Sequence, residues 1–244
     1  GLQANGAPSY AKYSLPNRDD IIYYDNRVHT DEVITSSQLE AKMKYLENGE
    51  PIRLAFSGRL LKIKGADDLL QVAEILIRKN VDFMLSIYGS GELETHMAHQ
   101  IKERNLHENV FLKGSVDFYA TLLPDLKSKT DLFVCLHRQG DPSCTYIESL
   151  SCGLPIVGYD NAAFSGILSN HTVGWSAPID NTMRIAEIIE SLDKNRSDIA
   201  TKAHSSLQFA KNNDFEKTFK KRIDHLIRHC KPVARKKTSR DGLL

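Results

Sequence analysis

The chain of 244 residues contains no run of apolar residues long enough to cross a membrane and no apolar region of the signal-peptide kind. Its four cysteines show no CxxC spacing, which argues against a disulfide framework and is typical of a reduced, cytoplasmic protein. Internal repeats and low-complexity segments are also absent. With 41% hydrophobic and 26% charged residues, the chain can bury an ordinary core and is not disordered.

The net charge is only +1, but it is unevenly distributed along the chain. Between Lys211 and Arg240, eleven basic residues stand against three acidic ones, which gives this segment a charge of +8. A solvated terminus is the simplest interpretation. The alternative is contact with an anionic surface such as lipid head groups, where each basic residue contributes about 1 kcal/mol.

From residue 52 onward, short apolar segments alternate with segments of helical periodicity. The predicted strands are Ile52–Phe56, Phe83–Tyr88, Val110–Leu112, Leu132–Leu136 and Leu154–Tyr159. The predicted helices are Asp67–Lys79, Glu92–Arg104, Phe118–Ser128, Cys144–Ser151, Asn181–Asp193, Asp198–Lys211 and Phe215–Cys230. This alternation predicts an α/β protein with a doubly wound parallel sheet and extra C-terminal helices. Right-handed crossovers would bring the carboxyl ends of all the strands to one edge of the sheet.

Before residue 51 the periodicity is weaker. Residues 1–30 are rich in Gly, Pro, Asn and Tyr, and we expect one short strand there, at Ile21–Tyr24. A helix is expected to begin after Thr30 as its N-cap and to end at Asn48 and Gly49. This part of the chain is typical of a linker or of a segment at the edge of a domain.

Two glycine-containing loops follow predicted strands at the carboxyl edge. In the first, Gly58 comes directly after the strand, and Arg59 and Lys64 flank the turn. Arginine offers a forked contact and lysine a point charge, so this pair suits a diphosphate, although such a pair is more often solvated surface. The second loop contains Gly89 and Gly91, which a tight strand-to-helix turn would also explain.

The segment from Gly140 to Asp160 has the layout of an anion site. A loop leads into a predicted helix, and Ser143, Cys144 and Thr145 stand at its start, where unpaired N–H groups and the helix dipole favour negative charge. Glu148 follows one turn later, where its carboxylate could accept hydrogen bonds from sugar or ribose hydroxyls. The simpler alternative is a solvated carboxylate on an ordinary βαβ crossover.

Four segments, in this order and at this spacing, resemble the C-terminal, donor-binding domain of retaining glycosyltransferases of family 4, which have the GT-B fold. They read FSGRLLKIKGADDLL, IYGSGEL, VFLKGSV and CTYIESLSCGLPIVGYD. The resemblance implies a site for a nucleotide-diphosphate sugar, the donor substrate, with neither a metal nor another cofactor. Arg59 and Lys64 match the family's diphosphate ligands. Glu148 matches the second glutamate of a paired-glutamate motif that holds the ribose hydroxyls.

The resemblance assigns further contacts. The turn Gly89–Gly91 and the loop around Lys113–Val116 match the wall on the nucleotide side, and Ser143–Thr145 would meet the distal phosphate. The family's first glutamate is missing, because Gly140 stands eight positions before Glu148. We expect the neighbouring Asp141 to take its place beside the donor sugar, or else an altered sugar contact.

The chain is also shorter than a two-domain GT-B enzyme, so it is expected to be the donor-binding half. Residues 1–50 would be the end of the interdomain connection, 51–212 the nucleotide-sugar-binding Rossmann-like domain, and 213–244 a C-terminal helix and basic tail. The implied activity is hexosyl transfer in polysaccharide biosynthesis, to a glycan or lipid-linked acceptor bound through a missing N-terminal domain. No nucleic-acid partner is expected, and the location would be the cytoplasm or the inner face of the membrane.

Two of three alternative functions stay open. A nucleotide-sugar epimerase shares the fold, and a non-catalytic nucleotide-sugar-binding module stays open because the acceptor half is missing. A Rossmann dehydrogenase would need GxGxxG after the first strand, where Ser57–Lys62 has a single glycine. His225 and His229 are four residues apart and adjacent to Cys230, but no third ligand converges in the sequence, so no metal site is predicted.

Overall fold

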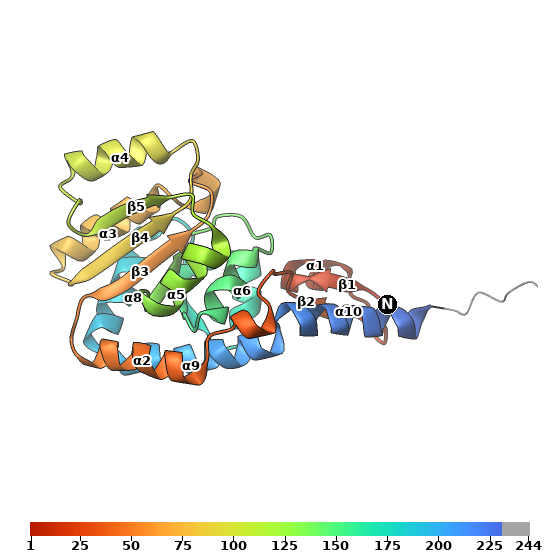
Figure 1. The fold of residues 1–244 in the computed structure, drawn as a ribbon. Helices are drawn as coiled ribbons and strands as arrows, with labels where there is room; N and C mark the ends of the chain where they lie inside the picture. Colours follow the sequence, from red (N-terminus) through yellow and green to blue (C-terminus); the bar gives the residue numbers. More distant parts are fainter. Residues whose placement is uncertain (231–244) are drawn as a thin grey trace, which may run out of the picture.

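Six parallel strands form the central sheet of the computed structural model, which describes residues 1–230 (Figure 1). Their order across the sheet is β5-β4-β3-β6-β7-β8. The strands are β3 (Ile52–Ser57), β4 (Phe83–Tyr88), β5 (Val110–Gly114), β6 (Leu132–Cys135), β7 (Ile156–Tyr159) and β8 (Gly174–Ala177). Every neighbouring pair is parallel, which confirms the predicted doubly wound α/β class.

The direction of winding reverses between β3 and β6. The chain runs outward from β3 to β4 and β5, and then outward from β6 to β7 and β8 on the other side. The loops that follow β3 and β6 therefore leave the sheet in opposite directions and open a crevice at its carboxyl edge. This is the place where doubly wound proteins bind their ligands.

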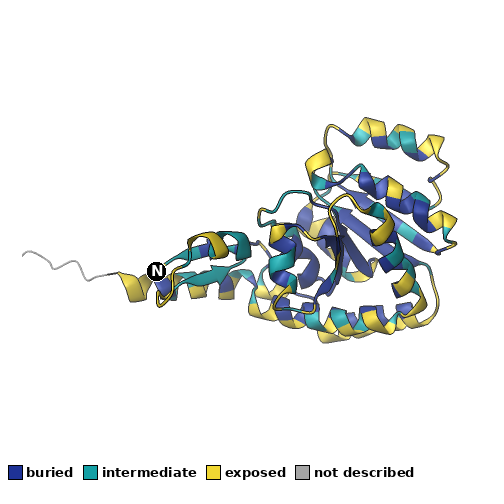
Figure 2. Cartoon of the chain, turned by 180° about the vertical axis from the view of Figure 1, so that it is seen from behind, coloured by how far each residue is buried: buried dark blue, intermediate teal, exposed yellow. Residues whose placement is uncertain are grey.

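Helices cover both faces of the sheet. In one layer, α3 (Asp68–Arg78) and α8 (Thr182–Lys194) contact each other. The other layer consists of α2 (Ser36–Glu47), α5 (Leu123–Ser128), α6 (Cys144–Ser151) and α9 (Ser197–Asn212), in which α2 contacts α5 and α9, and α9 also contacts α6. The remaining helices of the body are α4 (Glu94–Glu103) and α7 (Ala162–Leu168). All residues of β6 and β7 are buried, and the sheet is the buried centre of Figure 2. Continuous apolar runs such as these are typical of strands covered on both faces.

The predicted strands and helices of the body are confirmed to within two residues at most of their ends. The single helix expected at Phe118–Ser128 is instead a π-helical turn, Phe118–Leu122, followed by α5 with Pro124 in its first turn. Because proline has no N–H to donate, it fits the start of a new helical segment and not the middle of one. The segment Asn161–Ala177, which holds α7 and β8, had not been assigned from the sequence.

The prediction that a helix begins after Thr30 was wrong, because α2 begins at Ser36. Its N-cap is Thr35, whose hydroxyl accepts from the Gln38 N–H at 3.2 Å while the Gln38 side chain accepts from the Thr35 N–H at 2.9 Å. This reciprocal capping box satisfies two donors at once, which Thr30 could not do with Val33 in the third position. The predicted end at Asn48 is confirmed.

A small arm extends from the body and consists of β1 (Gln3–Asn5), α1 (Gly6–Tyr13), β2 (Ile21–Tyr23) and α10 (Phe215–His229) (Figure 1). Strands β1 and β2 pair in parallel, and α10 packs along β2. The strand predicted at Ile21–Tyr24 is thus confirmed, whereas β1 and α1 were not foreseen. The chain therefore brings its first and last described segments together.

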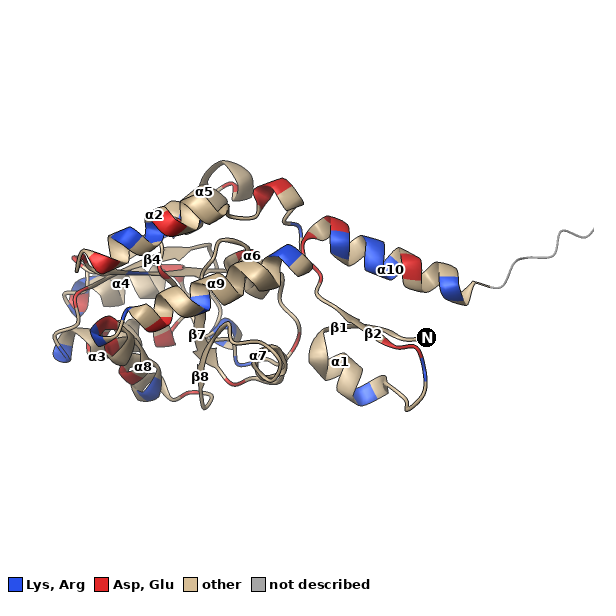
Figure 3. Ribbon diagram, turned by 90° about the horizontal axis from the view of Figure 1, so that it is seen from below, with Lys and Arg blue, Asp and Glu red and all other residues tan. Residues whose placement is uncertain are grey.

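Helix α10 exposes apolar as well as basic side chains. Ile223, Leu226 and Ile227 are 52%, 53% and 66% exposed, and Lys and Arg residues are spread along the helix (Figure 3). The basic residues from Lys231 onward lie outside the described residues, so contact of the C-terminal segment with a membrane stays a prediction. Among residues 1–230, no helix has the length and apolar character that spanning a bilayer demands.

Candidate functional site

Two adjoining clefts lie at the carboxyl edge of the sheet where the winding reverses. Their volumes are about 580 and 570 Å³. Both are lined by Arg27, Ser57, Gly58 and Arg59. The first cleft extends toward the start of α6, and the second extends toward the loops after β4 and β5. Gly58 and Arg59, two of the predicted ligands in the loop after β3, are therefore shared by the two clefts.

The first cleft contains both predicted diphosphate ligands, Arg59 and Lys64. Among residues 1–230, no carboxylate lies within ion-pair distance of either side chain. In contrast, the nearby Arg138 forms three ion pairs. Two cations without a carboxylate partner on the wall of one cleft give it a positive potential, and their role as diphosphate ligands stays a prediction.

The turn that holds Lys64 is fixed by Arg138, which follows β6. Its guanidinium contacts Asp68 at 2.6 Å and Asp180 at 2.6 Å and also donates to the Lys62 carbonyl. The Ile63 carbonyl accepts from the Arg138 N–H at 3.0 Å. The loop after β6 thus holds the loop after β3 at the point where Lys64 enters the cleft.

Gly65 closes the same turn and could not be replaced by a larger residue. Its φ is +67°, and a Cβ atom there would lie 2.0 Å from the Leu136 carbonyl oxygen. The glycine therefore lets the turn approach the end of β6 directly. This close approach sets the distance between Lys64 and the α6 side of the cleft.

The opposite wall is the first turn of α6. Ser143 is its N-cap, with φ −114° and ψ 133°, and no side chain caps the helix there. Ser143, Cys144 and Thr145 all line the first cleft, as predicted. The Tyr146 N–H donates to the Ser143 carbonyl at 3.2 Å, but the N–H groups of Cys144 and Thr145 precede the intrahelical bonds. The helix start therefore adds positive potential to the cleft that Arg59 and Lys64 line.

Glu148 also lines the first cleft, with its side chain only 8% exposed. Burial raises the pKa of its carboxyl group, and the neighbouring Arg27 opposes this shift. The Arg27 Nε donates to the Glu148 Oε1 at 2.8 Å. A carboxylate held in this way keeps its remaining lone pairs for hydroxyl groups that enter the cleft.

Arg27 could not be singled out from the sequence, because it lies in the segment interpreted as a linker. Its guanidinium lies over the Phe118 ring at 3.7 Å, and its carbonyl accepts from the Tyr119 hydroxyl at 2.9 Å. Arg27 thus spans the boundary between the two clefts. Only the folded chain brings this residue to Glu148, which is 121 positions away.

The second cleft is lined by Gly89 and Ser90 after β4 and by Ser115 and Val116 after β5, and the contact of this wall with a nucleotide stays a prediction. Gly89 has a φ of +122°, and a Cβ atom there would lie 1.9 Å from the Gly58 carbonyl oxygen. Only glycine allows the two loops to come so close. The predicted Gly91 does not line the cleft but packs against the backbone of Leu60.

Asp141 and His137 differ in whether they line a cleft. Asp141, predicted to contact the donor sugar, is exposed and does not line either cleft, and its role stays a prediction. His137 does line the first cleft and is only 2% exposed. Neither ring nitrogen has a hydrogen-bond partner among the described residues, and burial lowers the pKa of the imidazole to about 3.

Comparison with known proteins agrees with this arrangement. The chain is 31% identical over 102 residues to a poly(ribitol-phosphate) alpha-N-acetylglucosaminyltransferase of Staphylococcus aureus, covering 42% of this chain and 20% of that protein. It is 23% identical over 176 residues to N-acetyl-alpha-D-glucosaminyl L-malate synthase of Bacillus anthracis, covering 70% of this chain and 44% of that one. The chain thus spans less than half the length of these two relatives.

A solved structure has the same fold. Anabaena Alr3699/HepE in complex with UDP and glucose superposes with a TM-score of 0.70 at 15% identity, covering 93% of this chain and 62% of that one. Residues 37–213 match the model of the family described as glycosyl transferases group 1. The match includes both clefts apart from Arg27 and its neighbours Asp25 and Asn26. The chain therefore belongs to the group 1 glycosyl transferases and has the Rossmann-like half of the GT-B fold.

Proposed function

We propose that this chain is the donor-binding half of a retaining hexosyltransferase and that its two clefts hold a UDP-sugar. The observation that carries this proposal is the set of groups around the first cleft. Arg59, Lys64, the start of α6 and Glu148 all line this one cleft. Two cations with no carboxylate partner among the described residues match a diphosphate in charge, and a buried carboxylate matches a pair of ribose hydroxyls.

In the proposed complex, the second cleft holds the base and the first holds the ribose and the diphosphate. Arg59, Lys64 and the first-turn N–H groups of α6 stabilise the negative charge that the nucleoside diphosphate gains when its bond to the sugar breaks. Glu148 orients the ribose, and the network around Arg138 holds Lys64 in place. Because these groups are fixed and positively charged, the site neutralises the diphosphate without a divalent metal.

The relatives support the choice of donor and of stereochemistry. Two curated relatives are named for the transfer of an N-acetylglucosaminyl group in an alpha linkage. The Anabaena structure contains UDP and glucose. An alpha-linked product formed from an alpha-linked nucleotide sugar corresponds to retention. The acceptor, a glycan or a lipid-linked molecule, would be bound largely by residues that this chain does not include.

We expect the chain to bind UDP in the presence of a chelator, with a dissociation constant between about 10 μM and 1 mM. Each factor of ten corresponds to about 1.4 kcal/mol, and one side of the site is open to water. Isothermal titration calorimetry with UDP and GDP measures the affinity, and added magnesium should leave it unchanged. Binding that is detected only with magnesium would contradict the metal-independent site.

We also expect UDP affinity to depend on the ionisation of Glu148. An ionised carboxylate accepts hydroxyl hydrogen bonds more strongly than a protonated one, and burial raises the pKa of this group above its ordinary value. UDP affinity should therefore fall, by roughly fivefold (~1 kcal/mol), as the pH is lowered through that raised pKa. The matched control is Glu148→Gln, because the ratio of the two affinities cancels the titration of the ligand's own phosphate. A ratio that stays constant from pH 8 to 5 would contradict the assignment.

A further inference from the structure

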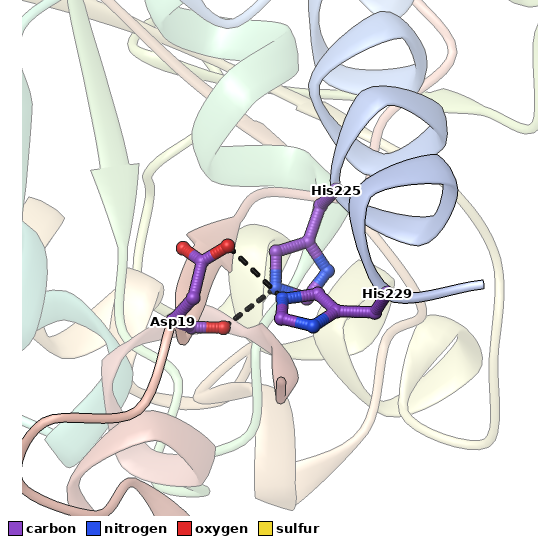
Figure 4. Close-up of side chains that lie close together, drawn as sticks. All are labelled: Asp19, His225 and His229. Carbon is purple, nitrogen blue, oxygen red and sulfur yellow. Dashed lines mark hydrogen bonds and ion pairs between the residues drawn. The ribbon is translucent and has the colours of Figure 1, made fainter. Parts of the chain in front are cut away.

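A cluster of two histidines and an aspartate lies in the arm, outside both clefts. His225 and His229 are on α10, and Asp19 is on the loop between α1 and β2 (Figure 4). The His229 Nε2 lies 3.0 Å from the Asp19 Oδ2, and the His225 Nε2 lies 2.7 Å from the Asp19 carbonyl oxygen. One ligand atom from each residue lies within 4.8 Å of the others. Among residues 1–230, this is the only such group of three or more.

The two histidines are four positions apart on one helix, so their side chains project from the same face. Their ring centroids are 4.6 Å apart. From the sequence this pair lacked a third ligand, and for that reason no metal site was predicted. The fold supplies the missing group, because the loop before β2 brings Asp19 to α10 across 210 positions of sequence.

We propose that Asp19, His225 and His229 form a Zn²⁺ site. Two imidazole nitrogens and one carboxylate oxygen form a ligand set that zinc accepts, whereas Mg²⁺ and Ca²⁺ prefer oxygen ligands alone. A tetrahedral ion with bonds of about 2.1 Å needs its ligand atoms about 3.4 Å apart. The His229–Asp19 contact of 3.0 Å is shorter than this by about 0.4 Å, and all three ligand atoms lie within 4.8 Å of one another, so small shifts of the side chains would bring them to tetrahedral spacing. The Asp19 carbonyl oxygen, which already contacts the His225 Nε2, could supply the fourth ligand.

The surroundings of His225 hold its ring in place. Its side chain is 1% exposed, and its Nδ1 lies 3.3 Å from the Gln3 amide nitrogen. That nitrogen also donates to the Arg222 carbonyl, and the Gln3 oxygen accepts from the Arg222 Nε, so the Nε2 of His225 carries the ring proton and donates it to the Asp19 carbonyl. A metal on Nε2 would move this proton to Nδ1, and the Gln3 amide would have to turn away from it. The contact between Nε2 and the Asp19 carbonyl is the one that the ion would replace.

One neighbour opposes the ion. The Arg228 Nε lies 3.3 Å from the same Asp19 oxygen that His229 contacts. A guanidinium in this position repels a divalent cation and competes for the carboxylate. Removing Arg228 should therefore strengthen zinc binding, which is the opposite of the effect of removing a ligand. The ion would link the loop before β2 to α10 and so hold the two segments of the arm together.

The test is a zinc titration of the whole chain, without a polyhistidine tag, against a chromophoric chelator. Cys144 and Cys230 are exposed thiols, so both are changed to serine in every variant compared. We expect one zinc ion per chain. His229→Ala and Asp19→Asn should each weaken binding at least tenfold, and Arg228→Ala should strengthen it severalfold. His204→Ala, at an exposed histidine on α9, is the matched control and should change nothing.

A second measurement guards against variants that merely unfold the arm. Zinc should raise the midpoint of thermal unfolding of the parent chain, because it binds only the folded arrangement, and it should not do so for His229→Ala. Magnesium at the same concentration should have no effect. The proposal is overturned if the chain binds no zinc, or if His229→Ala and His204→Ala bind it equally.

Discussion

Residues 1–244 are expected to bind a UDP-sugar but to transfer no sugar to an acceptor. Transfer requires the acceptor hydroxyl to be held against the anomeric carbon. Positioning of this kind is worth up to about 7–11 kcal/mol, which corresponds to roughly 10⁵- to 10⁸-fold in rate. The chain spans less than half the length of the two curated relatives described above, so it lacks much of what they contain.

The geometry of the clefts gives the physical reason. Their walls come from the loops after β3, β4, β5 and β6, all at one edge of one sheet. Among the described residues, only the segment that contains Arg27 reaches the clefts from outside that edge. Water therefore enters from the open side and weakens each electrostatic contact with the departing phosphate.

The measurement is UDP release from a panel of nucleotide sugars, with and without candidate acceptors. Lys64→Ala is the control for any background hydrolysis at the site. The release rate should be the same with and without an acceptor. Turnover that depends on the acceptor would contradict the proposal that this chain binds only the donor, and it would place an acceptor site within the chain.

The fold was largely predictable because its strands are buried on both faces and therefore appear as short, continuous apolar runs. Such runs identified β3, β4 and β6 almost to the residue. The arm was less predictable, since β1 and α1 are short, and the residues of β2 are only partly buried. Without a buried face, a segment has no periodicity that distinguishes a strand or helix from a linker.

Some residues of the candidate sites could be predicted from the sequence and others could not. Lys64 and Glu148 belong to continuous loop-and-helix segments, so local sequence could place them at the carboxyl edge. Arg27 and Asp19 contact side chains that are more than 100 positions away in the sequence, and nothing near Arg27 or Asp19 in the sequence indicates those contacts. The Asp19 contact forms within the arm, the Arg27 contact forms between the segment after β2 and α6, and no local pattern encodes either.

Within the site, Lys64→Ala and Glu148→Ala are expected to weaken UDP binding for different reasons. A hydrogen bond to a charged group contributes about 1.5–3 kcal/mol, so each change should cost about tenfold or more in affinity. For Lys64 the loss comes from the phosphate charge and should shrink as the salt concentration rises. Lys62→Ala is the matched control, because Lys62 is exposed on the same turn and lines neither cleft.

Glu148→Ala should leave the binding of pyrophosphate undiminished, because pyrophosphate has no ribose hydroxyls to donate hydrogen bonds to the carboxylate. The change also breaks the ion pair between Arg27 and Glu148. The freed Arg27 adds positive charge to the cleft, so pyrophosphate binding should not fall. Lys64→Ala, in contrast, should weaken UDP and pyrophosphate alike. Calorimetry with both ligands and both variants gives the four affinities. If Glu148→Ala weakens pyrophosphate as much as UDP, Glu148 supports the shape of the cleft and the ribose assignment is wrong.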